Sequence, residues 1–236
     1  MIIRVTLDNR ILQKLPRYEC KTILPGLELV RLPLHSVLNE AGMPIRYGYF
    51  LTSGLASVLT VLKHNKIVEV GLTGSEGFVG LPLVAGLRTS AVRVIAQTEG
   101  TALRINAKQL KKKLGRCPVL RKCLEQYALE IAAQANQIAA CNRLHDANQR
   151  LARWLLMSQD RLGGDVMHLT QEFLAHMLGM RRASVTVAVG FLQKEGLIKY
   201  TRGMIRIKDR GRLEAAACEC YAAITRHQAR WQKESR

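Results

Sequence analysis

The residues of this chain whose types and spacing suggest chemistry lie in one segment, QEFLAHMLGMRRASVTVAVG, which runs from Gln171 to Gly190. Two adjacent cations, Arg181 and Arg182, stand between apolar residues that recur at helical intervals. The pattern is typical of a helix-turn-helix, in which the start of the second helix enters the major groove of DNA. The alternative is a helical hairpin inside some other core.

Two short helices that cross near a right angle need particular residues at fixed offsets. Ala175 is small where the second helix crosses the first, Gly179 tolerates a positive φ in the turn, and Val185 locks the second helix onto the first. The remaining inward positions are Leu174, Leu178, Met180 and Ala188. The residues left at the exposed start and face of the second helix are Arg181, Arg182, Ala183, Thr186 and Val187.

The charge of the chain favours a polyanionic partner. The 236 residues include 36 Lys and Arg against 18 Asp and Glu, a net charge of +18, which suits nucleic acid or an acidic membrane surface. The densest basic stretch, residues 181–212, holds nine basic residues against Glu195 and Asp209. This stretch begins at the predicted DNA-reading helix.

Several other classes of protein are disfavoured. No apolar run approaches the ~20 residues that span a bilayer, and MIIRVTLDNRILQKLP lacks the pattern of a signal peptide. A cytoplasmic location without membrane contact is therefore predicted. The phosphate-binding loop with its lysine, HExxH and GxSxG are all absent, so we predict no catalytic residues and no enzyme. An aromatic content of 5% argues against the stacking platform of an RNA-binding protein.

The first of three regions extends to about Lys113. Short β-branched and apolar runs, separated by glycines and turn residues, predict strands over residues 58–62, 67–72, 91–96 and 101–105. Many short strands at regular spacing are typical of a β-sandwich or jelly roll. A glycine at every third position from Gly71 to Gly80 predicts a tight loop whose backbone N–H groups are free to face an anion.

The second region, from Pro118 to about Leu144, has helical periodicity. Its candidate coiled-coil seam, with spacings of 3, 4, 3, 4 and 3, is Leu124, Tyr127, Ile131, Gln134, Ile138 and Cys141. The seam predicts a homodimer, because readers of this kind usually work as two-fold dimers. The alternative is a core helix packed on the β region.

The third region begins near Asp146, the expected N-cap of a helix that ends at Gly163. Thr170 is the expected cap of the helix-turn-helix. After Gly196 the pattern changes to period two and predicts a hairpin, or wing, that turns at Arg202-Gly203. Wing residues available to phosphates are Lys199, Thr201, Arg202, Arg206 and Lys208. The tail over 213–231 predicts one further helix.

This succession of elements resembles the Crp/Fnr family of bacterial transcription regulators over nearly the whole chain. The resemblance is carried by Tyr49-Phe50 with Ser53-Gly54, GSEGFVGLP, CNRLH followed by RLARWLL, and LTQEFLAHMLGMRRASVT. Within the family the chain is similar to a subgroup with CNRLH and CECY signatures, whose effectors are undefined. The resemblance implies an α+β fold: a cyclic-nucleotide-binding-like β jelly roll in residues 1–117, a dimerisation helix in 118–145 and a winged helix-turn-helix in 146–236.

The resemblance also implies a homodimeric regulator that binds a two-fold symmetric operator in double-stranded DNA, with the recognition helix Arg182–Lys194 in the major groove. Such a regulator contacts RNA polymerase if it is an activator. Arg182 matches the family's recognition-helix arginine, which forks onto guanine O6 and N7. Ala183 and Val187 depart from the family's acidic and arginine positions, so the operator differs from the best-known site. The other predicted DNA contacts are Thr170, Gln171, Arg181, Ser184, Thr186, Thr201 and Arg202.

The match to the family's cyclic-nucleotide cassette is partial. Gly80, Arg88 and Thr89 fall on a cassette glycine and on the two residues that hold the cyclic phosphate. Leu81 stands where a glutamate holds the ribose hydroxyl, and Ala135 departs from the hydroxyl pair that reads adenine. We therefore expect no cAMP, and an undefined anionic or small effector or none. The candidate effector residues are Gly80, Arg88, Thr89 and Asn136.

The six cysteines do not predict a cofactor. A disulfide framework is not expected in a cytosolic chain, and an iron–sulfur cluster of this family needs several cysteines near the N-terminus, where only Cys20 is found. Cys141 with His145, or Cys218 with Cys220, offers two ligands each, fewer than a closed zinc site requires. We predict no metal site.

Two functions from different classes follow. In the first, a signal in the β region shifts the population of two states through the hinge over residues 144–147 and so alters the spacing of the two DNA readers. In the second, a cyclic-nucleotide-type signalling module acts through protein contacts. Arg181 and Arg182 favour the first, and steeply salt-dependent binding to duplex DNA distinguishes the two.

Overall fold

The computed structural model describes residues 8–234, apart from the side chains of Asn65 and Gln232. The described residues form two compact units: the first extends to Val58 and includes Leu72–Leu129, and the second is Leu59–Gly71 with the chain from Glu130 on. In the described part of the chain, no helix combines the length and apolar character needed to cross a membrane. Residues 1–7, with which the segment MIIRVTLDNRILQKLP begins, lie outside the residues that the structure describes. The three-part division of the chain stays a prediction.

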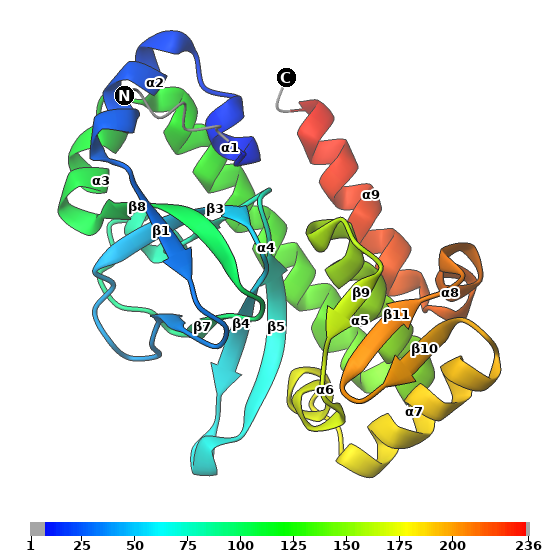
Figure 1. Ribbon diagram of the computed structural model, residues 1–236. Coiled ribbons are helices and arrows are strands. Elements are labelled where there is room, and N and C mark those ends of the chain that lie inside the picture. Colours follow the sequence, from blue (N-terminus) through cyan, green and yellow to red (C-terminus); the bar gives the residue numbers. More distant parts are fainter. Residues whose placement is uncertain (1–7, 235–236) are drawn as a thin grey trace. The chain divides into compact units, whose positions relative to one another are not determined.

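Two four-stranded sheets form the β region, with orders β1-β8-β3-β6 and β2-β7-β4-β5. Figure 1 labels β1, β8 and β3 of the first sheet and β7, β4 and β5 of the second. The strands are β1 (Glu28–Leu32), β2 (Val37–Asn39), β3 (Tyr47–Ser53), β4 (Ala56–Val61), β5 (Ile67–Thr73), β6 (Phe78–Val79), β7 (Arg93–Ala96) and β8 (Gly100–Asn106). Leu51 and Ala102 of one sheet share a buried cluster with Ala56 and Val94 of the other. The predicted β-rich front domain of an α+β chain is confirmed, since two sheets that bury their facing apolar residues make a sandwich.

Three helices of the first unit were not anticipated: α1 (Arg10–Gln13), α2 (Arg17–Ile23) and α3 (Ala107–Leu114). One of them determines where the long helix α4 (Pro118–Leu144) begins. The buried carboxylate of Glu19 in α2 accepts the backbone N–H groups of Val119 and Leu120 at 2.9 and 2.8 Å. A carboxylate there satisfies N–H groups that a helix start leaves without partners, and Pro118 suits the first turn.

The predicted seam of α4 does not face outward. Leu124, Tyr127, Gln134, Ile138 and Cys141 are buried within the chain, and Ile131 is half-buried. This assignment is therefore wrong: the 3-4 spacing marked the side of the helix that this chain covers itself. The exposed positions of α4 include Leu129 (63% exposed) and Leu144 (75% exposed).

The second unit contains α5 (Ala147–Leu162), α6 (Gln171–Leu178) and α7 (Arg182–Lys194), followed by the hairpin β10 (Ile198–Thr201) and β11 (Met204–Ile207). Asp146 caps α5 in a reciprocal capping box with Gln149, and Gly163 ends α5 in the left-handed region. These predicted ends are confirmed. A third strand, β9 (Val166–His168), pairs with β11 and was not anticipated.

The C-terminal tail consists of two helices, α8 (Arg210–Ala216) and α9 (Glu219–Glu234), so the single helix expected over 213–231 is wrong. The chain leaves helical geometry at Ala217. Arg210 and Tyr221, on either side of this bend, both bond to the Asp160 carboxylate, at 2.7 and 2.9 Å. Burial, and then the charge of Asp160, raises the pKa of Tyr221 to about 12. These bonds favour the bend over a continuous helix.

The glycine-rich loop between β5 and β6 uses its N–H groups internally. The Gly74 N–H donates to the Glu76 carboxylate at 3.1 Å, and the Gly77 N–H donates to the Gly74 carbonyl at 3.1 Å. The expectation that these groups are free for an anion is therefore wrong at both positions. The Glu76 side chain, which the spacing of the glycines does not reveal, supplies the acceptor for the Gly74 N–H.

Candidate nucleic-acid interface

Helices α6 and α7 form the turn that the sequence predicted. Gly179 lies in the left-handed region with φ 58°, and the Met180 N–H donates to the Ala175 carbonyl at 3.0 Å. Glycine suits this position because a left-handed backbone is strained for residues that carry a Cβ. The inward residues Leu174, Ala175, Leu178, Val185 and Ala188 are buried, and Met180 is partly buried.

The outer face of α7 is open. Arg181, Arg182, Ala183, Thr186 and Val187 are all exposed, as expected, and Val187 is 70% exposed. Arg181 precedes the helix with an extended backbone and makes no side-chain cap, and the first turn holds no acidic residue. The N–H groups of Arg182 and Ala183 therefore remain available to an anion such as a DNA phosphate, whereas the Ser184 N–H donates to the Arg181 carbonyl at 2.9 Å.

A hydrogen bond braces the two helices of the motif. The Thr186 hydroxyl donates to the Gln171 side-chain carbonyl at 2.6 Å and lies 3.1 Å from the Arg182 carbonyl. The bond uses the side-chain carbonyl of Gln171, so the NH2 group of that side chain is not engaged by Thr186. Thr170 caps α6 by accepting the Phe173 N–H at 3.1 Å. Thr186 thus has a positioning role that the sequence did not show.

The wing is held against the recognition helix. Its strands pair Ile198 with Ile207, which are both buried, and the Tyr200 N–H donates to the Gln193 side-chain carbonyl at 2.8 Å. Arg202 and Gly203 form the turn with φ of 47° and 78°, as predicted. The exposed polar residues of the wing and its end are Lys199, Thr201, Arg202, Arg206 and Lys208.

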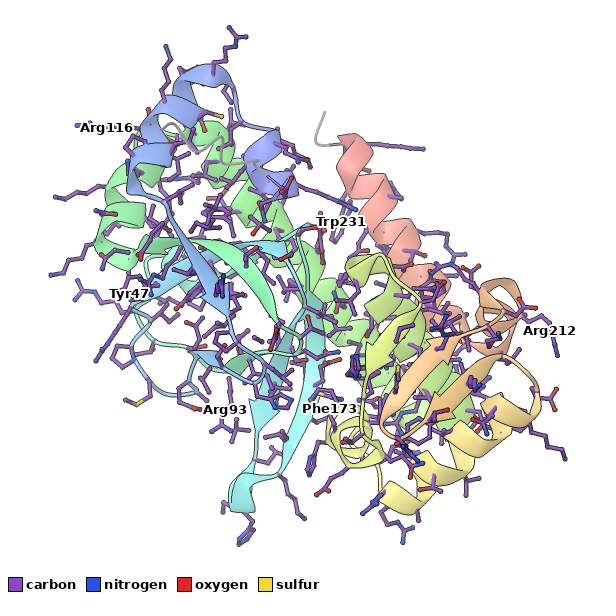
Figure 2. The ribbon with its side chains drawn as sticks, viewed as in Figure 1. Tyr47, Arg93, Arg116, Phe173, Arg212 and Trp231 are labelled. Carbon is purple, nitrogen blue, oxygen red and sulfur yellow. The ribbon has the colours of Figure 1, made fainter. Side chains whose placement is uncertain are left out.

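Part of the basic stretch is neutralised within the chain. Arg210 pairs with Asp160 at 2.7 Å and with Glu214 at 3.0 Å, and Arg212, labelled in Figure 2, lies 3.8 Å from Glu195. The surface that presents unpaired cations is therefore narrower than the sequence count suggests. This surface combines the start of α7 with the wing.

The first unit holds a separate cavity of about 390 Å³ at the ends of β3 and β8. Its lining includes four cations: Arg46, Arg88, Lys108 and Lys111. Tyr47, labelled in Figure 2, also lines the cavity, and the guanidinium of Arg104 lies 4.3 Å from the centre of the Tyr47 ring. Four cations around one cavity make it suitable for an anionic ligand.

The predicted effector residues are dispersed. Of the four, only Arg88 lines this cavity. Thr89 is exposed and pairs through its backbone with Pro44, and Gly80 adopts φ 114°, where its missing Cβ allows the Gly48 Cα to approach. Asn136 is exposed on α4. Gly80 thus has a backbone role. The sequence did not indicate Arg46, Lys108 and Lys111 as cavity residues, because residues distant in sequence converge only in the fold.

Two regions of the chain match known domains. Residues 29–117 match the cyclic nucleotide-binding domain, and residues 149–216 match the Crp-like helix-turn-helix domain. No curated protein sequence matches the chain significantly.

Solved structures share the fold. A protein from Eubacterium rectale assigned to the Crp/Fnr family is 18% identical, with a TM-score of 0.70, and the alignment covers 89% of this chain and 98% of that one. FixK2 from Bradyrhizobium japonicum is 16% identical, with a TM-score of 0.70 and coverage of 81% and 98%. The c-di-GMP-responsive global regulator CLP of Xanthomonas campestris is 17% identical, with a TM-score of 0.67 and coverage of 82% and 100%.

A cyclic nucleotide-binding domain followed by a Crp-like helix-turn-helix defines a class of transcriptional regulators, which are not enzymes. The chain belongs to the Crp/Fnr family of these regulators. Its helix-turn-helix is the DNA-binding part.

Proposed function

We propose that the chain acts in the cytoplasm as a homodimer that binds a two-fold symmetric operator, with α7 in the major groove of each half-site. The observation that supports this most strongly is the position of Arg182, which is exposed at the first residue of a helix braced by Thr186 and the wing. An arginine held at a recognition-helix start can fork onto guanine O6 and N7. Thr170, Gln171, Arg181, Ser184, Thr201 and Arg202 supply phosphate contacts that set the register.

The dimer forms through the exposed side of α4. Leu129, Ala132, Asn136, Ala139 and Arg143 are exposed on this helix at spacings of 3, 4, 3 and 4. The two alanines allow close approach of a second helix, and an asparagine in a seam fixes register at some cost in stability. We call these five residues the exposed stripe. It replaces the buried seam as the dimer contact.

Selection of random duplex DNA by the purified full-length protein, at near-physiological salt, tests the proposal. The expected result is a two-fold symmetric site with half-sites about 34 Å apart and a guanine in each half-site. Affinity should fall steeply with salt because phosphate contacts release counterions. If binding shows neither sequence preference nor salt dependence, the chain acts through protein contacts instead.

The cavity of the first unit is the effector site in this proposal. Its four cations suit a phosphate-bearing or carboxylate-bearing small molecule, and one neighbour by fold is described as responsive to c-di-GMP. Occupancy shifts the population of two dimer states through the hinge that follows α4. An activator of this type then contacts RNA polymerase.

Replacing Arg88 by alanine is expected to weaken binding of cyclic di-GMP or pyrophosphate by about 1.5–3 kcal/mol, the range for hydrogen bonds to charged groups. Isothermal titration calorimetry with each probe measures the loss. Arg116→Ala is the control, because Arg116 is exposed in the same unit (Figure 2) but does not line the cavity. Equal affinity in the wild type and the Arg88 variant would remove Arg88 from the effector site.

A further inference from the structure

Four side chains with metal-binding atoms meet in the second unit. Cys141 and His145 lie at the end of α4, while Cys218 lies in the bend before α9 and Cys220 in its first turn. The three sulfurs and the imidazole nitrogen all lie within 4.8 Å of one another. Each pair alone is too small for a closed site, but the fold brings the two pairs together into a set of four.

The distances agree with tetrahedral zinc. Zn–S bonds of about 2.3 Å and Zn–N bonds of about 2.0–2.1 Å place two ligand sulfurs about 3.8 Å apart, and a sulfur and a nitrogen about 3.6 Å apart. The sulfurs of Cys141 and Cys218 are 3.4 Å apart, and the Cys220 sulfur lies 3.6 Å from Nδ1 of His145. Small side-chain adjustments suffice to reach ideal geometry.

The surroundings orient the four ligands. Nε2 of His145 lies 3.1 Å from the Glu219 carboxylate, which leaves Nδ1 directed at the sulfurs. A carboxylate on the second nitrogen of a ligating histidine fixes its tautomer and orientation. The Gln137 side-chain NH2 donates to the Cys220 sulfur at 3.1 Å, as neighbours of metal-bound thiolates do. These partners are the second layer that a zinc site needs.

A buried cation accompanies the cluster. Arg153 of α5 is only 2% exposed, and its guanidinium interacts electrostatically with Cys141. A buried positive charge is costly unless an anion lies near it. Three thiolates, a neutral imidazole and Zn²⁺ carry one net negative charge, which balances part of the charge of Arg153 and of Arg150, a second buried arginine that interacts with Cys141 and Cys218.

Other occupants fit the geometry less well. A cubane iron–sulfur cluster lies between its four ligands and holds their sulfurs farther apart than this set allows. A disulfide between Cys141 and Cys218 would consume two of the four ligands, and both cysteines are free thiols in the structure. The closed, thiolate-rich, four-coordinate set is the arrangement of structural zinc sites.

We propose that Cys141, His145, Cys218 and Cys220 bind one zinc ion in a closed Cys3His site. The metal joins the last turn of α4 to the first turn of α9, immediately before Asp146 caps α5. It therefore fixes the C-terminal helix to the junction that leads into the helix-turn-helix domain. This site does not depend on the proposed operator or effector.

Metal analysis of the full-length protein, purified without chelators, tests the site. We expect about one zinc per chain. After metal removal under reducing conditions, Co²⁺ should restore one equivalent and give the thiolate charge-transfer band and the intense visible bands of a tetrahedral site. A zinc-free protein that also fails to show these cobalt bands, or that holds Cys141 and Cys218 as a disulfide when prepared under reducing conditions, overturns the proposal.

Variants assign the ligands. Cys218→Ser and Cys141→Ser should each lose the stoichiometric metal, whereas Cys117→Ser should keep it, because Cys117 is equally buried but lies outside the cluster. His145→Cys, which preserves four donors, should still bind cobalt with an altered spectrum. Glu219→Ala should bind zinc about 10–100-fold more weakly. Full metal content in Cys218→Ser would show that the ion sits elsewhere. If a serine variant folds poorly, metal binding by His145→Cys and Glu219→Ala still tests the same site.

Discussion

Replacing Arg182 by alanine is expected to remove discrimination at one base position of each half-site, at a cost of roughly 1–3 kcal/mol per half-site. Arg182 begins α7 and is exposed, and the Thr186–Gln171 bond and the wing hold the helix that carries it. A dimer places this arginine in both half-sites, so the two losses add in the affinity for the whole operator. Quantitative binding to the selected operator, and to versions changed at each base pair, measures the effect.

The control for Arg182 is Arg206→Ala. Arg206 is an equally charged and exposed residue on β11, where a phosphate contact is expected. This variant should weaken binding to every sequence to a similar extent and reduce the salt slope by about one. If Arg182→Ala instead behaves like Arg206→Ala, Arg182 contacts a phosphate and the base reading belongs to another residue of α7.

The double substitution Leu129→Asp with Ala139→Asp is expected to produce monomers. Both residues lie on the exposed stripe of α4, and two-fold symmetry brings like charges together across the interface. Loss of the second reader should lower operator affinity by about 10²–10⁴-fold, because the second half-site is no longer bound at a high effective concentration. Sedimentation velocity gives the oligomeric state, and operator titration gives the affinity.

The control for the dimer variant is Leu29→Asp on β1, because Leu29 is 57% exposed and so resembles Leu129 in accessibility. This variant should remain dimeric and bind the operator normally. Circular dichroism should show unchanged helix content for both variants, since neither stripe residue is buried. A Leu129/Ala139 variant that sediments as a dimer contradicts the assignment of the interface to this side of α4.

Local signals in the sequence determined the DNA-binding part of this protein. The caps at Asp146 and Thr170, the left-handed turn at Gly179 and the period-two hairpin around Arg202 each depend on a few neighbouring residues. Such features are fixed by backbone sterics and short-range hydrogen bonds, which one stretch of sequence contains in full. The exposed face of α7 followed from the same helical spacing.

Tertiary structure decided what periodicity leaves open. A 3-4 apolar spacing shows that one side of α4 is covered, but not whether this chain or a second copy covers it, and the chain covers that side itself. The bend between α8 and α9 depends on Arg210 and Tyr221 meeting Asp160, a partner that local propensity does not reveal.

Dependence on tertiary contacts also explains why the sequence predicted the DNA-binding motif but neither of the two candidate ligand sites. In the β region, Arg46, Arg88 and Lys108 converge on one cavity although they are distant in sequence. In the second unit, Cys141–His145 and Cys218–Cys220 are two incomplete ligand pairs until the fold joins them. The sequence by itself determined which residues can bind an anion or a metal, and only the tertiary structure decided which of them meet, because the contacts that bring them together are long-range.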